Sequence, residues 1–148
     1  MIDDTHYSLE YCLAHYGESI NGRYRENRTD EDDIKIGEMV AEHTTDTDLV
    51  LYRGICDYVY DLMKENAKGI PDCDLYEKGF LATSLVKGHE TNSKIKLRIY
   101  VPSGSKCIYQ GNVNGEQGFY EVDVMHGAKL KIISIDKEYI NCKLIATS

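Results

Sequence analysis

The sequence lacks the features that mark several common classes of protein. No apolar run approaches the ~20 residues that a membrane-spanning helix needs. The start, MIDDTHYSLEYC, has neither the basic nor the apolar region of a secretion signal. There is also no internal repeat and no low-complexity tract. We therefore expect a soluble, non-repetitive protein with no membrane partner.

Motifs for familiar cofactor and metal sites are missing too. The chain contains neither G-x-G-x-x-G nor G-x-x-x-x-G-K-[ST], which excludes a Rossmann dinucleotide site and a P-loop. The five histidines form no H-E-x-x-H motif, and the five cysteines form no C-x-x-C pair. We expect no metal site, and we expect the thiols to be reduced and mostly buried.

Length and charge further narrow the domain organisation and the kinds of ligand that we expect. A chain of 148 residues with 42% hydrophobic and 28% charged residues is typical of one packed domain, here residues 1–148, which we expect to be monomeric. The first 48 residues hold 13 acidic and four basic side chains, whereas the rest hold 12 and 13. The acidic third would repel a duplex nucleic acid, while the remainder could still bind a compact anion such as a pyrophosphate. Solubility alone explains the acidity equally well.

Hydrophobic spacing predicts helices in the first half of the chain. One helix runs from Ser8, its N-cap, to about Arg25, and Thr29 or Asp30 caps a second helix. The apolar positions of the second helix are Ile34, Ile36, Met39 and Val40. A short strand, 49–52, stops at Gly54, and helical spacing returns from Cys56 to about Glu65.

After Pro71 the pattern changes to strands. We expect them at residues 79–85, 94–101, 106–109, 119–125, 129–136 and 139–146. The turns between them are short, which favours antiparallel meanders with one buried face. Helices first and strands later predict the α+β class.

Three segments place an unusual polar residue on or beside an apolar strand. In LYRGI, Arg53 ends a strand and offers a guanidinium fork to phosphate oxygens, although strand-end arginines commonly just reach water. In GFLATSL, Thr83 and Ser84 are hydroxyls that either face a cleft or pair across strands. In GFYEVDV, Glu121 follows the loop NVNGEQG and could stabilise an oxocarbenium-like centre, or be an ordinary exposed strand glutamate.

Arginine, a serine-bearing strand and a glutamate after a loop, in this order, resemble the arginine–serine–glutamate class of mono-ADP-ribosyltransferases. The class includes clostridial binary-toxin components and Rho-modifying exoenzymes. The segments INGRYRE, DLVLYRGI, GFLATSL, IYVPSGSKCIY and YEVDVMHGAKLKI each look like the family's matching segment, in the right order. The resemblance implies N-terminal helices packed on a split antiparallel β-sandwich whose two sheets form an NAD⁺ cleft.

The resemblance also implies roles. Arg53 would hold the phosphates of NAD⁺, Ser84 would orient the catalytic Glu121, and Glu121 would stabilise the ribosyl cation as nicotinamide departs. Gly54 would let the backbone pair with the nicotinamide carboxamide. Phe80 and Thr83 are assigned to the same NAD⁺ site. The acceptor would be a protein side chain, modified by a toxin or effector from a bacterium or phage that acts in the cytoplasm or after delivery into a host cell.

The sequence departs from the family pattern at two positions. The usual serine-threonine-serine triplet is Ala82-Thr83-Ser84, so one hydroxyl is missing. Two residues before Glu121, where the family carries a glutamate or glutamine that engages the acceptor, this chain has Phe119. We expect Phe119 to meet an apolar patch of the acceptor, with Glu116 or Gln117 as polar substitutes.

Two other functions compete with transfer. Phe119 makes an NAD⁺ glycohydrolase, which uses water as acceptor, a natural alternative. A non-catalytic NAD⁺-binding module is the other alternative, but the joint presence of Arg53, Ser84 and Glu121 argues against a decayed site.

Overall fold

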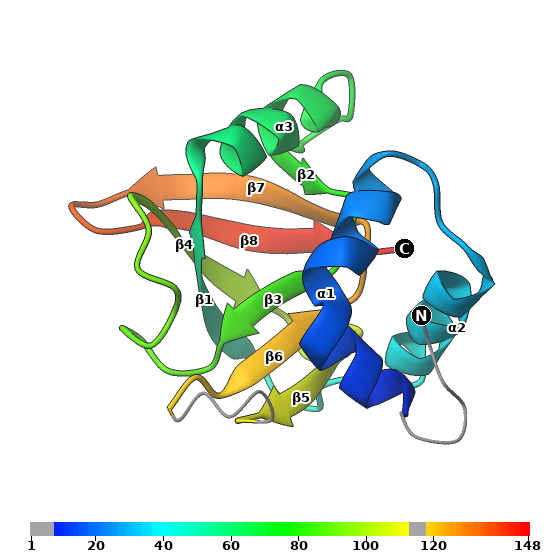
Figure 1. Ribbon diagram of the computed structural model, residues 1–148. Coiled ribbons are helices and arrows are strands. Elements are labelled where there is room, and N and C mark those ends of the chain that lie inside the picture. The colour runs from blue at the N-terminus through cyan, green and yellow to red at the C-terminus, as the bar shows by residue number, and fades with distance from the viewer. Residues whose placement is uncertain (1–7, 113–117) are drawn as a thin grey trace.

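A computed structural model describes residues 8–112 and 118–148 (Figure 1). Its helices are α1 (Leu9–Arg25), α2 (Glu31–Ala41) and α3 (Asp57–Ala67). Ser8 caps α1 by accepting a hydrogen bond from the Tyr11 amide at 3.0 Å, and Asp30 forms a capping box with Asp33 at the start of α2. The predicted helices and the Ser8 cap are confirmed, and Asp30 rather than Thr29 caps α2.

The strands form one eight-stranded sheet. They are β1 (Leu49–Ile55), β2 (Leu75–Glu77), β3 (Leu81–Ser84), β4 (Ile95–Val101), β5 (Cys107–Gly111), β6 (Glu121–Val124), β7 (Ala128–Ile135) and β8 (Ile140–Ala146). Their order is β2-β7-β8-β4-β1-β3-β6-β5. The α+β class is confirmed. The expected meander is present only as the hairpins β5–β6 and β7–β8. Strand β3 instead lies between β1 and β6, and β8 lies between β7 and β4 and runs parallel to β4.

Four details of the sequence prediction were wrong. The first strand continues through Arg53 and Gly54 to Ile55, because every residue of β1 pairs with β4. Strand β2 was not expected. Strand β6 begins at Glu121 rather than Phe119, since Tyr120 has φ +53° and interrupts the extended backbone. Ile34, expected on the buried face of α2, is 53% exposed.

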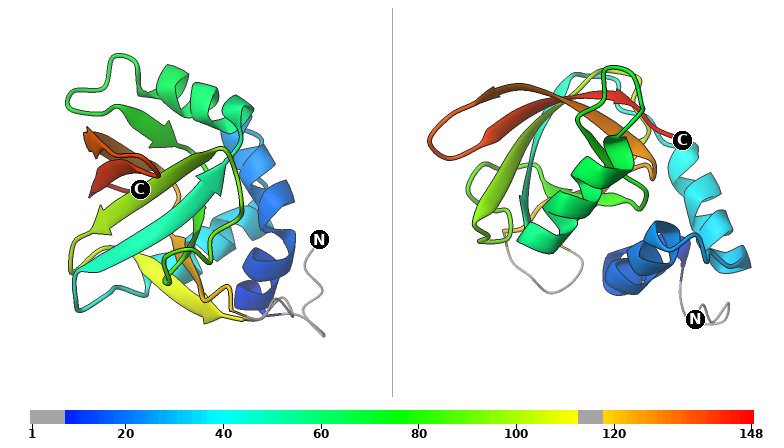
Figure 2. Two further views of the ribbon diagram at one scale, coloured as in Figure 1. Left: turned by 90° about the vertical axis from the view of Figure 1, so that its left-hand side faces the viewer. Right: turned by 90° about the horizontal axis from the view of Figure 1, so that it is seen from above.

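Two clusters of apolar side chains hold the elements together. The larger one lies along the sheet and includes Leu51, Leu97, Ile99, Val124 and Leu130. The smaller one joins α1 and α2 to the β3, β6 and β5 end of the sheet. Figure 2 shows α1 and α2 together on one side of the sheet, with α3 packed separately near β2. The sheet residues beneath α1 are therefore those of β3, β6 and β5.

Polar contacts fix how α1 lies on this end of the sheet. The Asn21 side chain accepts from the Phe80 amide at 2.7 Å and donates to the Phe80 carbonyl at 3.0 Å. Arg25 forms two hydrogen bonds with the buried carboxylate of Glu77, at 2.5 and 3.1 Å. Gln110 of β5 donates to the Glu10 carbonyl at 3.0 Å. Because these contacts are spread along α1, the helix has a defined position over the sheet.

The described residues also show the state of the cysteines and whether any helix or side-chain cluster among them suits a membrane or a metal ion. Within residues 8–112 and 118–148, no helix is long and apolar enough to span a membrane, and no group of three His, Cys, Asp or Glu residues has the arrangement of a metal site. All five cysteines are free, and Cys12, Cys107 and Cys142 are buried.

Candidate functional site

A cavity of about 510 Å³ lies between α1 and the sheet. Its volume falls in the range of small-molecule sites, roughly 300–1,000 Å³. Its walls come from α1, β1, the start of α3, β3, β6 and the segment between β3 and β4. The polar and charged residues among them are His15, Glu18, Asn21, Arg25, Arg53, Cys56, Thr91, Ser93, Glu121 and Asp123. The cavity therefore combines cationic and anionic side chains in one space.

Arg53 supplies the most deeply placed positive charge of the cavity. Its Nη1 donates to the Ala82 carbonyl at 2.7 Å, but its Nε is buried and has no partner among the described residues. Burial lowers the pKa of Arg53, an effect that the carboxylate of Glu77 partly offsets. A guanidinium stays protonated even so, and a buried donor without an acceptor is costly, so this site favours an anionic ligand.

A glycine is required at position 54 because another segment of the protein passes close to its backbone. A Cβ at this position would overlap the backbone carbonyl oxygen of Thr91 and would lie 3.0 Å from the Ser93 Oγ. The absence of a side chain therefore lets the segment between β3 and β4 pass directly over β1. Gly54, Thr91 and Ser93 then form one continuous part of the cavity wall.

Phe80 lies at the junction of the cavity and the smaller apolar cluster. It is 1% exposed, and its ring contacts Tyr24 and His126 edge to face, with ring centroids 5.4 and 5.3 Å apart. Its backbone is held by Asn21, as described above. Phe80 is therefore a rigid element of the wall under α1.

Thr83 and Ser84 are both buried but do not line the cavity. Thr83 Oγ1 donates to the Val122 carbonyl at 2.7 Å, which ties β3 to β6. Ser84 pairs with Glu121 across the two strands, and its hydroxyl lies 2.6 Å from the Phe119 carbonyl and 3.1 Å from the Val86 carbonyl. In this structure the two hydroxyls hold the backbone around Glu121.

Glu121 and Asp123 lie on the same face of β6 and both line the cavity. Glu121 is 7% exposed and Asp123 only 1%. Burial, together with the neighbouring charge of Glu121, raises the pKa of Asp123 well above its ordinary value. Two adjacent buried carboxyls cannot both ionise easily, which favours a proton shared between them.

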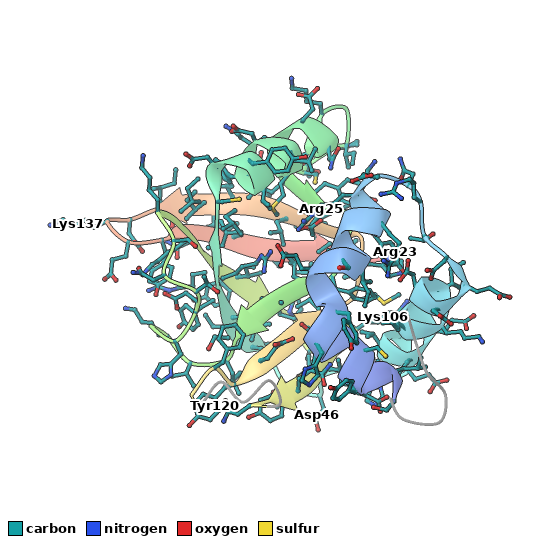
Figure 3. All side chains as sticks on the ribbon, in the orientation of Figure 1. Arg23, Arg25, Asp46, Lys106, Tyr120 and Lys137 are labelled. Atoms are coloured by element: carbon teal, nitrogen blue, oxygen red, sulfur yellow. The ribbon has the colours of Figure 1, made fainter. Side chains whose placement is uncertain are left out.

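Phe119 lies outside β6, which begins at Glu121. The positive φ of Tyr120 interrupts the extended backbone between them, so the alternation rule that we used for Phe119 does not apply. Figure 3 places Tyr120 at the end of β6, where its amide donates to the Asn112 side chain at 2.9 Å. Phe119 itself is half-buried. Glu116 and Gln117 lie outside the described residues.

Sequence reasoning missed most of the polar residues that line the cavity, among them Asn21, Arg25 and Asp123. Arg25 projects from the C-terminal end of α1 beside the sheet (Figure 3). Asn21 and Arg25 lie four residues apart, hence on one face of α1, which was a detectable signal within INGRYRE. For Asp123, the signal was its two-residue spacing from Glu121 in a strand.

The arrangement suits a ligand with two distinct parts. Arg53 and Arg25 can contact phosphate oxygens. The Glu121 carboxylate can stabilise positive charge that develops at a carbon atom when a leaving group departs. A ligand that contains both phosphate groups and a glycosidic bond to be broken would contact the two arginines and Glu121.

Comparisons with known proteins agree with this chemistry. The family model described as ADP-ribosyltransferase exoenzyme matches residues 9–147. A comparison with curated proteins found no match.

Solved structures share the fold at low sequence identity. C3larvin toxin, an ADP-ribosyltransferase from Paenibacillus larvae, has 16% identity and a TM-score of 0.72, covering 97% of this chain and 96% of its own. The Clostridium limosum C3 exoenzyme has 19% identity and a TM-score of 0.71, covering 95% and 86%. C3stau2 from S. aureus, solved with NAD, has 20% identity and a TM-score of 0.68, covering 94% and 87%.

The structural likenesses establish the ADP-ribosyltransferase fold, and the family match extends over nearly the whole sequence. The chain belongs to the ADP-ribosyltransferase exoenzyme family.

Proposed function

We propose that this NAD⁺-dependent ADP-ribosyltransferase binds NAD⁺ in the cavity between α1 and the sheet, with Glu121 as its catalytic carboxylate. Arg53 holds the pyrophosphate, and the wall around Gly54 and Phe80 receives the nicotinamide end. The observation that carries the proposal is that Arg53 and Glu121, distant in sequence, line one cavity, with the Arg53 Nε buried and without an acceptor among the described residues.

Glu121 acts chiefly in the transition state. As the bond between nicotinamide and ribose lengthens, positive charge develops at the anomeric carbon, and a buried carboxylate stabilises that charge more than it stabilises bound NAD⁺. Ser84 and Thr83 contribute by fixing the backbone on both sides of Glu121. ADP-ribose then passes to an acceptor that enters from the open side of the cavity.

A protein side chain is the acceptor that we propose, with the enzyme acting as a bacterial toxin or effector. The relatives described as toxins and exoenzymes support this choice. Phe119 adds support, because a half-buried aromatic beside Glu121 offers an apolar contact to a protein surface. The match to a transferase family does not favour the glycohydrolase alternative.

The proposal is tested with adenylate-labelled NAD⁺ and a cell lysate. We expect wild-type enzyme to release nicotinamide and to transfer label to a discrete protein band. Release of nicotinamide with no labelled macromolecule would show that the enzyme hydrolyses NAD⁺ instead of transferring ADP-ribose. No release of nicotinamide under any condition would contradict both enzymatic functions.

The role of Phe119 has its own test. We expect Phe119→Ala to keep NAD⁺ hydrolysis but to lose at least about 1.4 kcal/mol of acceptor interaction, a tenfold fall in labelling rate. Phe119→Tyr, which keeps the ring, is the matched control. Labelling by Phe119→Ala at the wild-type rate would remove Phe119 from acceptor recognition.

A further inference from the structure

Asp123 is a buried carboxyl that the proposed chemistry of Glu121 does not yet use. It lies two residues after Glu121 on β6, on the face that lines the cavity. On one side it is the register partner of Ala82 in β3, and on the other of Ile108 in β5. Gln110 donates to its Oδ2 at 3.3 Å.

The position opposite Asp123 holds only a methyl group. The family pattern has a hydroxyl at the place of Ala82, whereas here the small side chain leaves room for the Asp123 carboxyl beside Glu121. The other hydroxyl of that pattern, Ser84, has a single proton, and the Phe119 and Val86 carbonyls lie within hydrogen-bond distance of it. The Ser84 proton is therefore directed to the backbone, and a donor to Glu121 can also come from a neighbouring side chain.

A protonated Asp123 can be that donor. Its carboxyl forms a side-chain hydrogen bond with Glu121, and burial together with the adjacent Glu121 charge raises its pKa well above the ordinary range. The Gln110 hydrogen bond and the Arg53 charge oppose this rise without cancelling it. A neutral carboxyl beside an ionised one is how proteins commonly keep one carboxylate oriented at neutral pH.

We propose that Asp123 is a positioning residue, which keeps its proton and donates a hydrogen bond to the Glu121 carboxylate in place of the hydroxyl missing at Ala82. The inference rests on the proposed catalytic role of Glu121. Asp123 acts through Glu121 and transfers no proton during the reaction.

Other polar and charged groups face the pair of Asp123 and Glu121 and contribute to the pH dependence of the reaction rate. Arg53 faces it from β1, Gln110 is the polar neighbour on β5, and His15, Glu18 and Arg25 of α1 line the same cavity. His15 is the histidine among these residues, so His15→Gln is included as a background for every pH profile.

The test compares Asp123→Asn with Asp123→Leu in the full chain. Asparagine keeps a donor that does not titrate, whereas leucine has the volume of a core residue and no donor. Asp61→Asn on the exposed face of α3 is the matched control. For each protein we measure kcat and KM for nicotinamide release as a function of pH, with circular dichroism and NAD⁺ titration to verify folding.

We expect Asp123→Leu to lower kcat roughly tenfold or more, with KM within about twofold, because a hydrogen bond to a charged group is lost from the transition state. Its acid limb moves to higher pH, since Glu121 loses a donor that favours its ionised form. Asp123→Asn restores kcat to within about threefold of wild type, and the alkaline limb that reports ionisation of Asp123 disappears.

Three results would overturn the inference. A wild-type kcat and pH profile for Asp123→Leu would show that Glu121 needs no such donor. An Asp123→Asn variant as slow as Asp123→Leu would show that a negative charge, not a donor, is required. The third result is full activity of Glu121→Gln, which would remove Glu121 itself from catalysis and is measured in the same series, so the two failures are distinguishable.

Discussion

At the scale of single residues, Arg53 has hydrogen-bonding capacity that the described part of the chain satisfies only in part. Its side chain has one hydrogen bond to the backbone and one buried donor without a partner in the described chain. Such a donor destabilises the empty protein and is satisfied when an acceptor arrives. We therefore expect Arg53 to serve ligand binding rather than stability.

Replacing Arg53 with lysine tests this explanation. A point ammonium cannot reproduce a planar fork on phosphate oxygens, so we expect Arg53→Lys to weaken NAD⁺ binding about tenfold, or roughly 1.4 kcal/mol. Titration calorimetry measures the change, and Lys64→Arg on the exposed side of α3 is the control for a general charge effect. Unchanged affinity would remove Arg53 from the phosphate site.

The residue types in the sequence were enough to select some of the residues that line the cavity. Arg53, Gly54 and Glu121 could be selected because charge or glycine beside an apolar strand is unusual, and all three line the cavity. The directions of Thr83 and Ser84 could not be read from the sequence, because they depend on the register between β3 and β6. The two-residue spacing of Asp123 from Glu121 indicated a shared strand face, but the register that places Ala82 opposite Asp123 could not be read from the sequence.

At the scale of elements, the segment between β3 and β4 is held against the sheet by two features. Gly54 permits the close passage of Thr91 over β1. The buried Glu90 carboxylate accepts from the Tyr139 hydroxyl at 3.0 Å and lies 3.4 Å from the Lys96 ammonium. These contacts keep Thr91 and Ser93 in the cavity wall.

Adding one methyl group to β1 should displace this segment. We expect Gly54→Ala to push Thr91 away from β1 and to weaken NAD⁺ binding, at a stability cost of about 1–3 kcal/mol typical of overpacking. Calorimetry and thermal unfolding measure the two effects. Gly22→Ala is a suitable comparison, since a Cβ there meets nothing within 4 Å and Gly22 does not line the cavity. Normal NAD⁺ affinity of the Gly54→Ala variant would show that the segment does not depend on this contact.

A buried ion pair joins α1 to α2 in addition to the smaller apolar cluster. Arg23 donates to both oxygens of the Asp33 carboxylate, at 2.7 and 2.8 Å, and the Asp33 side chain is 1% exposed. Burial by itself would raise the pKa of Asp33, but the Arg23 hydrogen bonds and the capping amide of α2 lower it below its ordinary value. The stabilisation is therefore present above the unfolded pKa of Asp33 and is lost as pH falls through its folded pKa.

We expect Asp33→Asn to lower the free energy of unfolding by about 1–3 kcal/mol at neutral pH, because Arg23 loses its partner and α2 loses part of its cap. The deficit should shrink as the pH is lowered below about 4, where the wild-type carboxylate also becomes protonated. Glu26→Gln, which breaks the exposed Arg28 pair, is the control and should change stability by no more than about 0.5 kcal/mol. A constant deficit from acid to neutral pH would contradict this account.

At the scale of the whole molecule, the sequence predicted the class and the order of elements well. The helical caps and the alternating apolar residues of β4 act locally, so their signals are visible in short windows. The parallel pairing of β8 with β4 joins segments that are distant in the chain and leaves no local signal. The cavity itself arises only when α1 lies across β3 and β6, which no single segment encodes.

The same architecture connects fold and function. The continuous sheet brings Arg53 of β1 and Glu121 of β6 to one cavity through the intervening strand β3, and α1 closes the cavity from the other side. In the mechanism that we propose, the rate depends on how differently Glu121 interacts with bound NAD⁺ and with the ribosyl cation.

The most direct test of this account is the rate of nicotinamide release and the affinity for NAD⁺, measured together for wild type and Glu121→Gln. The amide keeps the shape of the side chain but removes its charge. We expect the rate to fall by about 10²-fold or more while the dissociation constant changes by no more than about twofold, since the carboxylate acts mainly in the transition state. Near-normal turnover of Glu121→Gln, or a loss confined to NAD⁺ affinity, would contradict the assignment of Glu121 as the catalytic carboxylate.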